Sequence, residues 1–516
     1  MILNRLGIFV ILALSGISIH AQNRVILDLS SAKDTIHRNV YGHFAEHLGR
    51  CIYGGIYVGD DNRSVPHHNG IRLDIVEALK KLKTPVLRWP GGCFADAYHW
   101  MDGIGPKENR PHTENTSWGN IREDNSFGTN EFLEFCSMIN AEPYLAVNVG
   151  SGTVKAASDW VKYVNHANGS SWLTDLREKS GRKTPWNVRY WGVGNESWDC
   201  GGNMTAAYYV NEYKRYATHM TSYSNSEGLY RIAVGPGSPD YSWTETVMRE
   251  IPLKLMEGLS VHHYSVIDWA NKGSATEFTE ADYIRTMEAA WRMEEFIRRN
   301  KAIMDKYDPA KKVALIVDEW GGWYESEPGT NKAFLYQQNT MRDAMIAGLT
   351  LNIFHHHADR VKMANLAQIV NVLQAVILTR EEKMILTPTY HVMEMYNVHQ
   401  DALAIPVKVT SEKYRVGEKA IQAVSASASR DSTGSVHISL VNMDASKEQI
   451  VSVELGNTAI KPVSGRILKG KNLQDHNRFD APDAIKPVPF DGALSVRNNV
   501  LSLTLPPASV LVIKLK

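Results

Sequence analysis

The sequence predicts a (β/α)8 barrel followed by an antiparallel β-sandwich. Between about residues 35 and 400, short β-branched or apolar runs alternate with longer stretches of helical spacing. Eight such runs can be counted, and two of them lead directly into a glutamate. After about residue 400 the apolar residues recur with a period of two, which is typical of strands with one buried face. Together these observations favour a barrel over an open, doubly wound sheet.

The expected barrel strands are residues 39–43, 86–89, 143–149, 189–194, 231–235, 259–264, 313–318 and 349–355. The amphipathic segments between them predict helices at residues 71–83, 130–140, 154–165, 205–221, 282–307 and 332–346. Residues 24–29 also alternate, so a short N-terminal strand within residues 22–34 is expected to join the sandwich. The predicted domains are therefore a barrel over residues 35–400 and a sandwich over residues 401–516.

The N-terminus has the pattern of a secretory signal peptide. Arg5 precedes an apolar stretch at residues 6–14, and small residues follow as far as Ala21. We therefore expect a signal peptide at residues 1–21 and an exported protein, periplasmic or extracellular. No later run of about 20 apolar residues predicts a membrane span.

The composition excludes several classes of partner. Lys plus Arg and Asp plus Glu each number 56, and no long run of one sign is present. We therefore expect no nucleic-acid or membrane partner, and a neutral ligand fits better. The glycine-rich signatures of nucleotide-binding proteins do not occur at any strand-to-helix turn.

The cysteines show no disulfide framework and no metal-ligand spacing. There are four of them, at Cys51, Cys93, Cys136 and Cys200. Export would permit a bridge, but the spacing selects no pair, and isolated buried thiols are the simplest interpretation of all four.

Glu196 and Glu319 are the strongest candidates for chemistry. Each follows a short apolar run that is predicted to be a barrel strand, and catalytic side chains of barrels emerge at that end of the strands. A charge at the end of a buried strand has few structural explanations. Two carboxylates in one cleft are the equipment of a glycoside hydrolase, with one proton donor and one nucleophile or base. Separations of about 5 to 5.5 Å indicate retention, and about 6.5 to 9.5 Å indicate inversion.

At these residues the chain resembles a known family, the α-L-arabinofuranosidases of glycoside hydrolase family 51. The resemblance runs in order through essentially the whole chain beyond residue 40. Gly194-Asn195-Glu196 alone indicates only the wider clan of retaining barrel hydrolases, whereas the segment formed by residues 46–50 and 52–55 is much more specific. The matching segments are residues 41–50, 52–57, 88–92, 102–106, 194–196, 318–320 and 357–361.

The resemblance implies an exo-acting enzyme that removes terminal α-L-arabinofuranosyl units with retention. It implies that Glu196 is the acid/base and Glu319 the nucleophile. Asn195 and Glu46 match sugar-binding residues, although Glu46 could instead be a partner for Arg50. Further matches to residues around the sugar or the two glutamates are His262, Tyr264, Gln368 and Trp118. Alternation of the strand places His262 and Tyr264 on one side, and His263 on the other, behind the barrel.

Cys93 is a departure from the family pattern. Many members have asparagine at this position, where it bonds sugar hydroxyls, whereas a thiol is a weak donor and a weak acceptor. Cys93 remains a candidate substrate-binding residue, but we expect the contact to be weakened or taken over by a neighbour. Alternatively, Cys93 is a small buried residue that only fills space at the end of the strand.

The resemblance implies plant arabinan, arabinoxylan or derived oligosaccharides as partners, and a homo-oligomer, often a hexamer. Two alternatives stay open: a β-xylosidase or endo-glucanase of the same clan, and a non-catalytic glycan-binding protein. No cofactor or metal is expected, because retaining hydrolysis needs neither. His355, His356 and His357 would alternate between the faces of an extended strand, so they could not all reach one ion.

Overall fold

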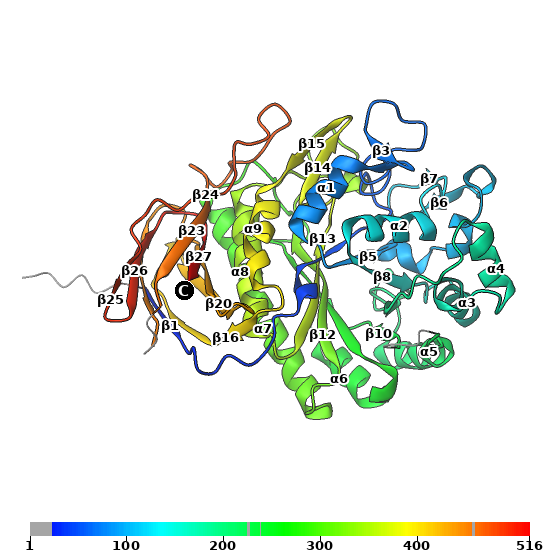
Figure 1. The fold of residues 1–516 in the computed structure, drawn as a ribbon, viewed down its shortest axis with the longest axis horizontal. Helices are drawn as coiled ribbons and strands as arrows, with labels where there is room; N and C mark the ends of the chain where they lie inside the picture. Colours follow the sequence, from blue (N-terminus) through cyan, green and yellow to red (C-terminus); the bar gives the residue numbers. More distant parts are fainter. Residues whose placement is uncertain (1–22, 224–227, 238, 457–459) are drawn as a thin grey trace, which may run out of the picture.

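The computed structural model describes residues 23–223, 228–237, 239–456 and 460–516. Its centre is a closed barrel of eight parallel strands, with a two-sheet β-sandwich beside it (Figure 1). The fold-class prediction is therefore confirmed. The barrel strands are β2 (Gly42–Phe44), β5 (Val86–Trp89), β8 (Glu142–Val147), β9 (Tyr190–Val193), β10 (Tyr230–Ala233), β11 (Gly258–Ser265), β12 (Ala314–Gly322) and β13 (Val361–Ala367). They follow one another around the barrel, and β13 pairs with β2 to close it.

Helices return the chain between consecutive strands. Because every strand is parallel to its neighbours, the carboxyl ends of all eight open at the same mouth of the barrel. The α-helices are α1 (Leu73–Leu82), α2 (Thr129–Ile139), α3 (Val154–Asn165), α4 (Trp172–Lys179), α5 (Ala206–His219), α6 (Tyr241–Glu250), α7 (Glu280–Tyr307), α8 (Met341–His356) and α9 (Pro388–Tyr396).

The sandwich consists of a five-stranded and a six-stranded sheet. The first contains β17 (Val407–Thr410), β1 (Asn23–Leu27), β22 (Gln449–Glu454), β26 (Val500–Leu505) and β25 (Ser495–Arg497). The second contains β16 (Leu403–Ile405), β20 (Val424–Arg430), β21 (Val436–Asn442), β27 (Ser509–Leu515), β23 (Pro462–Lys469) and β24 (Val488–Pro489). The N-terminal strand β1 lies in the first sheet, antiparallel to β17 and parallel to β22. Figure 1 shows this blue strand beside the C-terminal strands.

Short hairpins extend from the loops. They are β3–β4 (His67–His68, Ile71–Arg72), β6–β7 (Thr113–Asn115, Ile121–Glu123), β14–β15 (Ile377–Arg380, Lys383–Leu386) and β18–β19 (Lys413–Val416, Lys419–Gln422). Single 3-10 turns are η1 (Arg38–Tyr41), η2 (Cys93–Asp96), η3 (Trp100–Gly103), η4 (Lys107–Asn109), η5 (Leu253–Leu255), η6 (Lys332–Phe334) and η7 (Asn397–His399).

The prediction of a strand at residues 349–355 is wrong, because these residues belong to helix α8. The eighth strand is β13, and the helix expected at residues 332–346 begins only at Met341. Helix α8 lies between the barrel and the sandwich (Figure 1), and all but its last residue are buried. At Gly348 an added Cβ would lie 2.9 Å from Val441 of the sandwich, so the two parts approach closely. A helix that is buried all round has no polar face, and its sequence therefore shows no helical period.

This correction also changes the reason for rejecting a metal at the three consecutive histidines. They lie at the end of a helix, and each contacts a different partner. His355 lies 2.8 Å from Ser427 Oγ and 2.8 Å from Tyr41 Oη. His356 lies 2.9 Å from the Ala426 carbonyl, and His357 lies 3.0 Å from Glu294. Two of the three therefore attach the helix to the sandwich.

The first barrel strand is also shorter than predicted. Residues 39–41 form the end of the 3-10 turn η1, and β2 begins only at Gly42. Bounds of the other predicted strands differ by a few residues, which is the usual uncertainty at the ends of elements.

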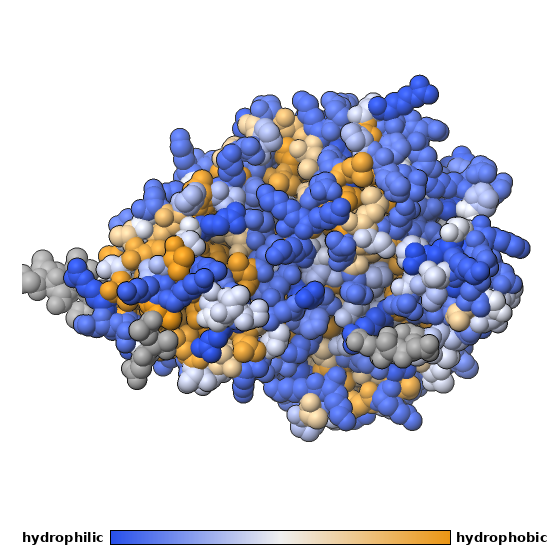
Figure 2. All heavy atoms as spheres, in the orientation of Figure 1, coloured by the Kyte–Doolittle hydropathy of each residue, from blue (hydrophilic) through white to orange (hydrophobic). Residues whose placement is uncertain are grey.

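Polar side chains cover most of the face seen in Figure 2, and hydrophobic ones gather over the sandwich. Exposed apolar residues there include Leu403, Val463 and Val488. Within the part of the chain that the structure describes, every helix is too short or too polar to span a bilayer.

Candidate active site

A narrow pocket opens at the mouth of the barrel and contains both candidate glutamates. Its walls come from loops that follow most of the barrel strands. The lining residues are Glu46, Leu48, Gly92, Cys93, Trp118, Glu196, Tyr264, Glu319, Trp323, Leu335, Gln368 and Leu373. Besides the two glutamates, five residues that the sequence nominated line this pocket: Glu46, Cys93, Trp118, Tyr264 and Gln368. A sixth, His262, contacts Glu196.

Glu196 leaves the end of β9 through a tight turn. Gly194 has φ of 89°, and Glu196 itself has φ of 39°, in the left-handed region that non-glycine residues avoid. Asp96 supports this turn: its carboxylate accepts hydrogen bonds from the backbone N–H of Asn195 at 2.8 Å and of Val149 at 2.7 Å. Burial raises the pKa of Asp96 to about 7, although the backbone donors oppose that rise. Asp96 thus ties the ends of β8 and β9 to the turn after β5.

Glu319 is held by two donors from neighbouring strands. Arg88 of β5 donates to Oε1 at 2.8 Å, and the hydroxyl of Tyr264 of β11 donates to Oε2 at 2.8 Å. Burial opposes the charge of Arg88, yet Asp318 and Glu319 raise its pKa above the ordinary value. These two hydrogen bonds fix both oxygens of the Glu319 carboxylate at the mouth of the barrel.

The two glutamates are close to each other. One carboxylate oxygen of Glu196, one of Glu319 and a ring nitrogen of His262 all lie within 4.8 Å of one another. This spacing is that of retaining glycosidases and lies below the separation of about 6.5 to 9.5 Å that inversion requires.

His262 bridges the two glutamates. Its Nδ1 lies 2.7 Å from Glu196 Oε1 and 3.5 Å from Glu319 Oε2. Burial lowers the pKa of His262, but the charges of Glu319 and Asp318 outweigh burial and raise it to about 10. The pKa of Glu196 is raised by burial, and His262 opposes part of that rise. His263 points the other way and contacts the Ala289 carbonyl of α7 at 2.9 Å, as strand alternation predicts.

Glu46 is surrounded by donors on the pocket wall. Trp118 Nε1 donates to its Oε1 at 2.9 Å, and Gln368 Nε2 donates to its Oε2 at 2.9 Å. Burial, followed by the charge of Glu319, raises the pKa of Glu46 to about 7. The alternative of a partnership with Arg50 is wrong, because that guanidinium donates to Thr379.

Asn195 has one side of its amide free for a ligand. Its Oδ1 accepts a hydrogen bond of 2.6 Å from Arg88. That bond orients Nδ2, which lies 3.9 Å from the Cys200 sulfur. An amide N–H in this position can donate to a sugar hydroxyl.

The interpretation of all four cysteines as free thiols is wrong, because Cys93 and Cys200 form a disulfide. It links the turn after β5 to the loop after β9, and the two residues are 107 positions apart. Cys200 Sγ lies 3.7 Å from Glu196 Oε2, so the disulfide contributes to the pocket wall beside that carboxylate. A disulfide sulfur has no proton to donate, so Cys93 cannot serve as a thiol donor to a sugar. Cys51 and Cys136 are buried and free.

Among the residues that the structure describes, two groups have the spacing of metal ligands, and both lie in this pocket. One is Glu196 with Cys93 and Cys200, and the other is Glu196 with His262 and Glu319. The first does not fit a metal, because both sulfurs are in a disulfide. In the second, Arg88, Tyr264 and the contact between His262 and Glu196 already engage the ligand atoms. The chemistry of these donors is that of acid–base and nucleophilic catalysis.

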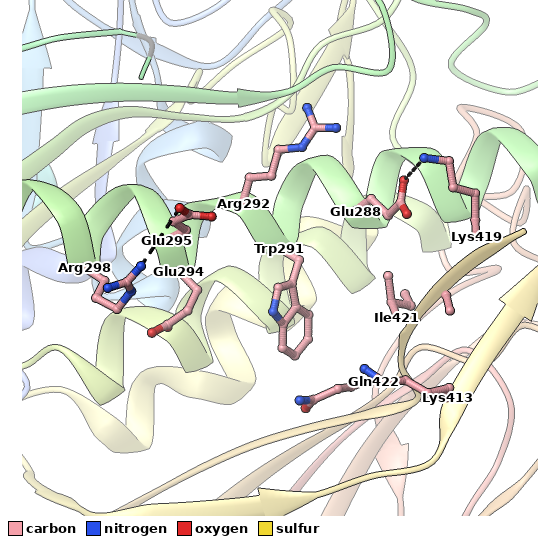
Figure 3. Close-up of a pocket in the computed structure, with 11 residues that line it drawn as sticks. Glu288, Trp291, Arg292, Glu294, Glu295, Arg298, Lys413, Lys419, Ile421 and Gln422 are labelled. Atoms are coloured by element: carbon pink, nitrogen blue, oxygen red, sulfur yellow. Dashed lines mark ion pairs between the residues drawn. The ribbon is translucent and has the colours of Figure 1, made fainter. Parts of the chain in front are cut away.

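Larger grooves lie elsewhere on the surface. One of about 570 Å³ lies between α7 and the hairpin β18–β19 (Figure 3). Trp291 projects into it from α7, and its carboxylates are paired with cations, as Glu288 is with Lys419 at 2.8 Å. Carboxylates that are paired with cations on an exposed helix cannot serve as proton donor and nucleophile. The barrel pocket is therefore the better candidate for the active site.

Several residues of the site were not nominated from the sequence. They are Arg88, Asp96, Tyr144, Cys200, Asp318 and Trp323. Arg88 and Asp318 could have been suspected, because each is a charged residue inside a buried strand. The others owe their position to contacts between segments that are far apart along the chain.

Comparisons with known proteins agree with this geometry. The model of the "Alpha-L-arabinofuranosidase 1 domain" matches residues 78–275, and that of the "Alpha-L-arabinofuranosidase C-terminal domain" matches residues 318–509. The "Intracellular exo-alpha-L-arabinofuranosidase" of Bacteroides ovatus is 48% identical over 97% of this chain and 98% of its own. The crystal structure of the GH51 arabinofuranosidase from Xanthomonas axonopodis pv. citri is 44% identical, with a TM-score of 0.94, covering 96% of this chain and 100% of that one. The Thermotoga maritima α-L-arabinofuranosidase in its arabinose complex is 31% identical, with a TM-score of 0.83, over 95% and 99% of the two chains.

A barrel with two neighbouring glutamates, one just beyond β9 and one in β12, defines a glycoside hydrolase, and their spacing is that of the retaining kind. With near-complete coverage at 48% identity, the chain belongs to glycoside hydrolase family 51, the α-L-arabinofuranosidases.

The prediction of an exported protein is contradicted. The relative from Bacteroides ovatus, which aligns over 97% of this chain, is named an intracellular enzyme. The expected signal peptide at residues 1–21 lies outside the described residues. Its basis was a nine-residue apolar stretch behind one arginine, and so short a compositional pattern carries little weight against a match over the whole chain.

Proposed function

We propose that this chain is an exo-acting α-L-arabinofuranosidase that releases terminal L-arabinofuranose with retention of configuration. The observation that carries the proposal is the approach of Glu196 and Glu319 to within 4.8 Å inside one narrow pocket. A pocket accepts the end of a chain, whereas an endo-acting enzyme needs an open groove. The activities for which the relatives are named support the identity of the sugar.

The reaction proceeds by double displacement. Glu319 attacks the anomeric carbon while protonated Glu196 donates to the leaving oxygen, which gives a glycosyl ester and a free alcohol. Glu196 is then ionised and removes a proton from water, which attacks the ester and releases arabinose. Burial favours the proton on Glu196 in the first step, and hydrogen bonds from Arg88 and Tyr264 orient the carboxylate of Glu319.

Residues around the pocket bind the sugar hydroxyls. Glu46, held by Trp118 and Gln368, offers carboxylate oxygens, and Asn195 offers an amide N–H. Hydrogen bonds that strengthen as positive charge develops on the ring stabilise the transition state more than the substrate. Arabinan, arabinoxylan and their oligosaccharides are the proposed sources of the sugar.

A homo-oligomer is part of this proposal, and exposed Leu403, Val463 and Val488 of the sandwich offer apolar surface for it.

The test of this function is a panel of p-nitrophenyl glycosides. We expect strong turnover of the α-L-arabinofuranoside and at least about 100-fold lower kcat/KM for the β-D-xyloside and β-D-glucoside, because misplacing reacting atoms by about 1 Å costs that much. From arabino-oligosaccharides, chromatography should show monosaccharide from the earliest time points. Early oligomers would support an endo-glucanase instead, preference for the xyloside a β-xylosidase, and no turnover a glycan-binding protein.

The disulfide gives a second prediction. Replacing both cysteines by serine, or reducing the protein, should lower kcat/KM for the arabinofuranoside by about 10- to 100-fold, because the loop that carries Glu196 loses its covalent link to β5. The bridge closes a loop of 107 residues, so the unfolding midpoint should also fall, with a cost of about 2–5 kcal/mol.

The control for this experiment is Cys51→Ser, which alters a buried free thiol away from the turn after β9. Activity should be compared at temperatures where near-ultraviolet circular dichroism shows each variant folded. Full activity of the reduced protein would show that the loop holds Glu196 without the disulfide.

A further inference from the structure

Asp318 is a buried carboxylate that the reaction described above does not use. It precedes Glu319 in β12 and is 2% exposed. Its Oδ2 accepts a hydrogen bond of 2.8 Å from the Tyr144 hydroxyl of β8 and lies 3.6 Å from Arg88 Nε of β5. Its Oδ1 lies 3.1 Å from Nε2 of His262 in β11. Three strands therefore bring a polar group to this one side chain.

A bulge in β12 explains why two consecutive acids both reach the barrel interior. Ser260 of β11 pairs with Ile316, but His262 pairs with Glu319, so β12 has one extra residue between these positions. Regular alternation would turn Asp318 away from the side that Glu319 faces, and bulges re-aim side chains in this way beside active sites.

The ring of His262 therefore lies between Asp318 and the two glutamates. One ring nitrogen faces Asp318 at 3.1 Å, and the other lies 2.7 Å from Glu196 and 3.5 Å from Glu319. A neutral imidazole donates from only one nitrogen, whereas an imidazolium donates from both. An arrangement with carboxylates at both nitrogens is satisfied by the doubly protonated ring.

We propose that Asp318 is a positioning residue that acts through His262: it holds the ring as a cationic donor to Glu196 and so sets the pH at which Glu196 loses its proton. Asp318 itself does not line the pocket. This proposal rests on the proposed role of Glu196 as acid/base.

The charges around the ring support this role. The groups that face His262 are Glu196 from the loop after β9 and Asp318 and Glu319 from β12. Those that face Asp318 are Arg88, Tyr144 and His262. Burial would raise the pKa of Asp318, but Arg88 and His262 lower it, so this carboxylate is ionised at neutral pH. With the pKa of His262 raised to about 10, the ring stays cationic over the same range.

The expected effect of Asp318→Asn follows from these charges. Without the negative charge of Asp318, the pKa of His262 falls, and the ring loses its second proton at neutral pH. Glu196 then has no cation beside it, so burial raises the pKa of Glu196 further. The alkaline limb of kcat/KM, which reports loss of the proton from the acid, should move up by about one pH unit or more.

The experiment measures kcat/KM against pH with an unactivated arabino-oligosaccharide, for the wild type, Asp318→Asn and Tyr144→Phe. Tyr144→Phe removes a hydrogen bond to Asp318 but keeps its charge, so its alkaline limb should move far less. If Asp318→Asn lowered kcat/KM but left the pH of its alkaline limb unchanged, Asp318 would have only a structural role, and the proposal would be overturned.

A second measurement reads the protonation of the ring in the wild-type protein itself. Ring ¹⁵N shifts of histidine-labelled wild type, with His262 assigned from its loss in His262→Gln, should show both nitrogens protonated from pH 6 to 8. A neutral His262 in that range would overturn the proposal. If Glu196→Ala kept the wild-type alkaline limb, the proposed role of Glu196 would fail instead.

Discussion

Glu319→Ala should lower kcat/KM for every arabinofuranoside by about 10⁴-fold or more, because the variant has no group that can form the glycosyl ester. The leaving group should not matter. Even with a dinitrophenolate as leaving group, the first step stays slow without the carboxylate that compensates the positive charge on the sugar ring. The measurement is steady-state hydrolysis of an activated and an unactivated substrate, together with a search for a phenol burst, which should be absent.

The control for this variant is Glu294→Ala. It also removes a carboxylate from an ion pair, with His357 at 3.0 Å, but on helix α7 and outside the pocket. We expect its kcat/KM to stay within about twofold of the wild type, since surface pairs contribute little. If Glu319→Ala retained more than a few per cent of activity on any substrate, another residue would have to be the nucleophile.

The positions of Glu196 and Glu319 could be predicted from the sequence because they depend on local patterns. Each follows a short apolar strand, and a parallel barrel brings the ends of all strands to one mouth. The same reasoning marks Asp318 only as an unusual charge in a buried strand and does not give the direction of its side chain. Its side chain faces the interior only because β12 has a bulge opposite Ser260 and His262, and a bulge depends on the pairing of two strands.

Contacts between distant segments account for the other omissions. The Cys93–Cys200 bridge joins two loops that are adjacent only after β5, β8 and β9 have paired. Asp96 accepts hydrogen bonds from backbone N–H groups on two such loops, and nothing in its own neighbourhood indicates this. The second half of helix α8, residues 349–355, is predicted as a strand for a related reason: burial by both barrel and sandwich removes the periodicity on which a helix prediction depends.

Glu196→Ala should affect the two steps of the reaction differently, and the leaving group should reveal the difference. An unactivated oligosaccharide needs a proton on its departing oxygen, so its kcat/KM should fall by about 10²- to 10⁴-fold. A dinitrophenyl arabinofuranoside departs without a proton, so its kcat/KM should fall by less than about tenfold. Hydrolysis of the glycosyl ester still lacks its base, so kcat falls and the ester accumulates.

Stopped-flow absorbance with the dinitrophenyl substrate should therefore show a burst of about one phenol per site, followed by slow turnover. The low kcat should be accompanied by a low KM, because accumulation of the ester lowers both. The structure provides the reason for expecting intact geometry in this variant: Arg88 and Tyr264 hold Glu319 independently of Glu196. Equal losses on activated and unactivated substrates would contradict an acid role for Glu196, since only the unactivated leaving group needs its proton.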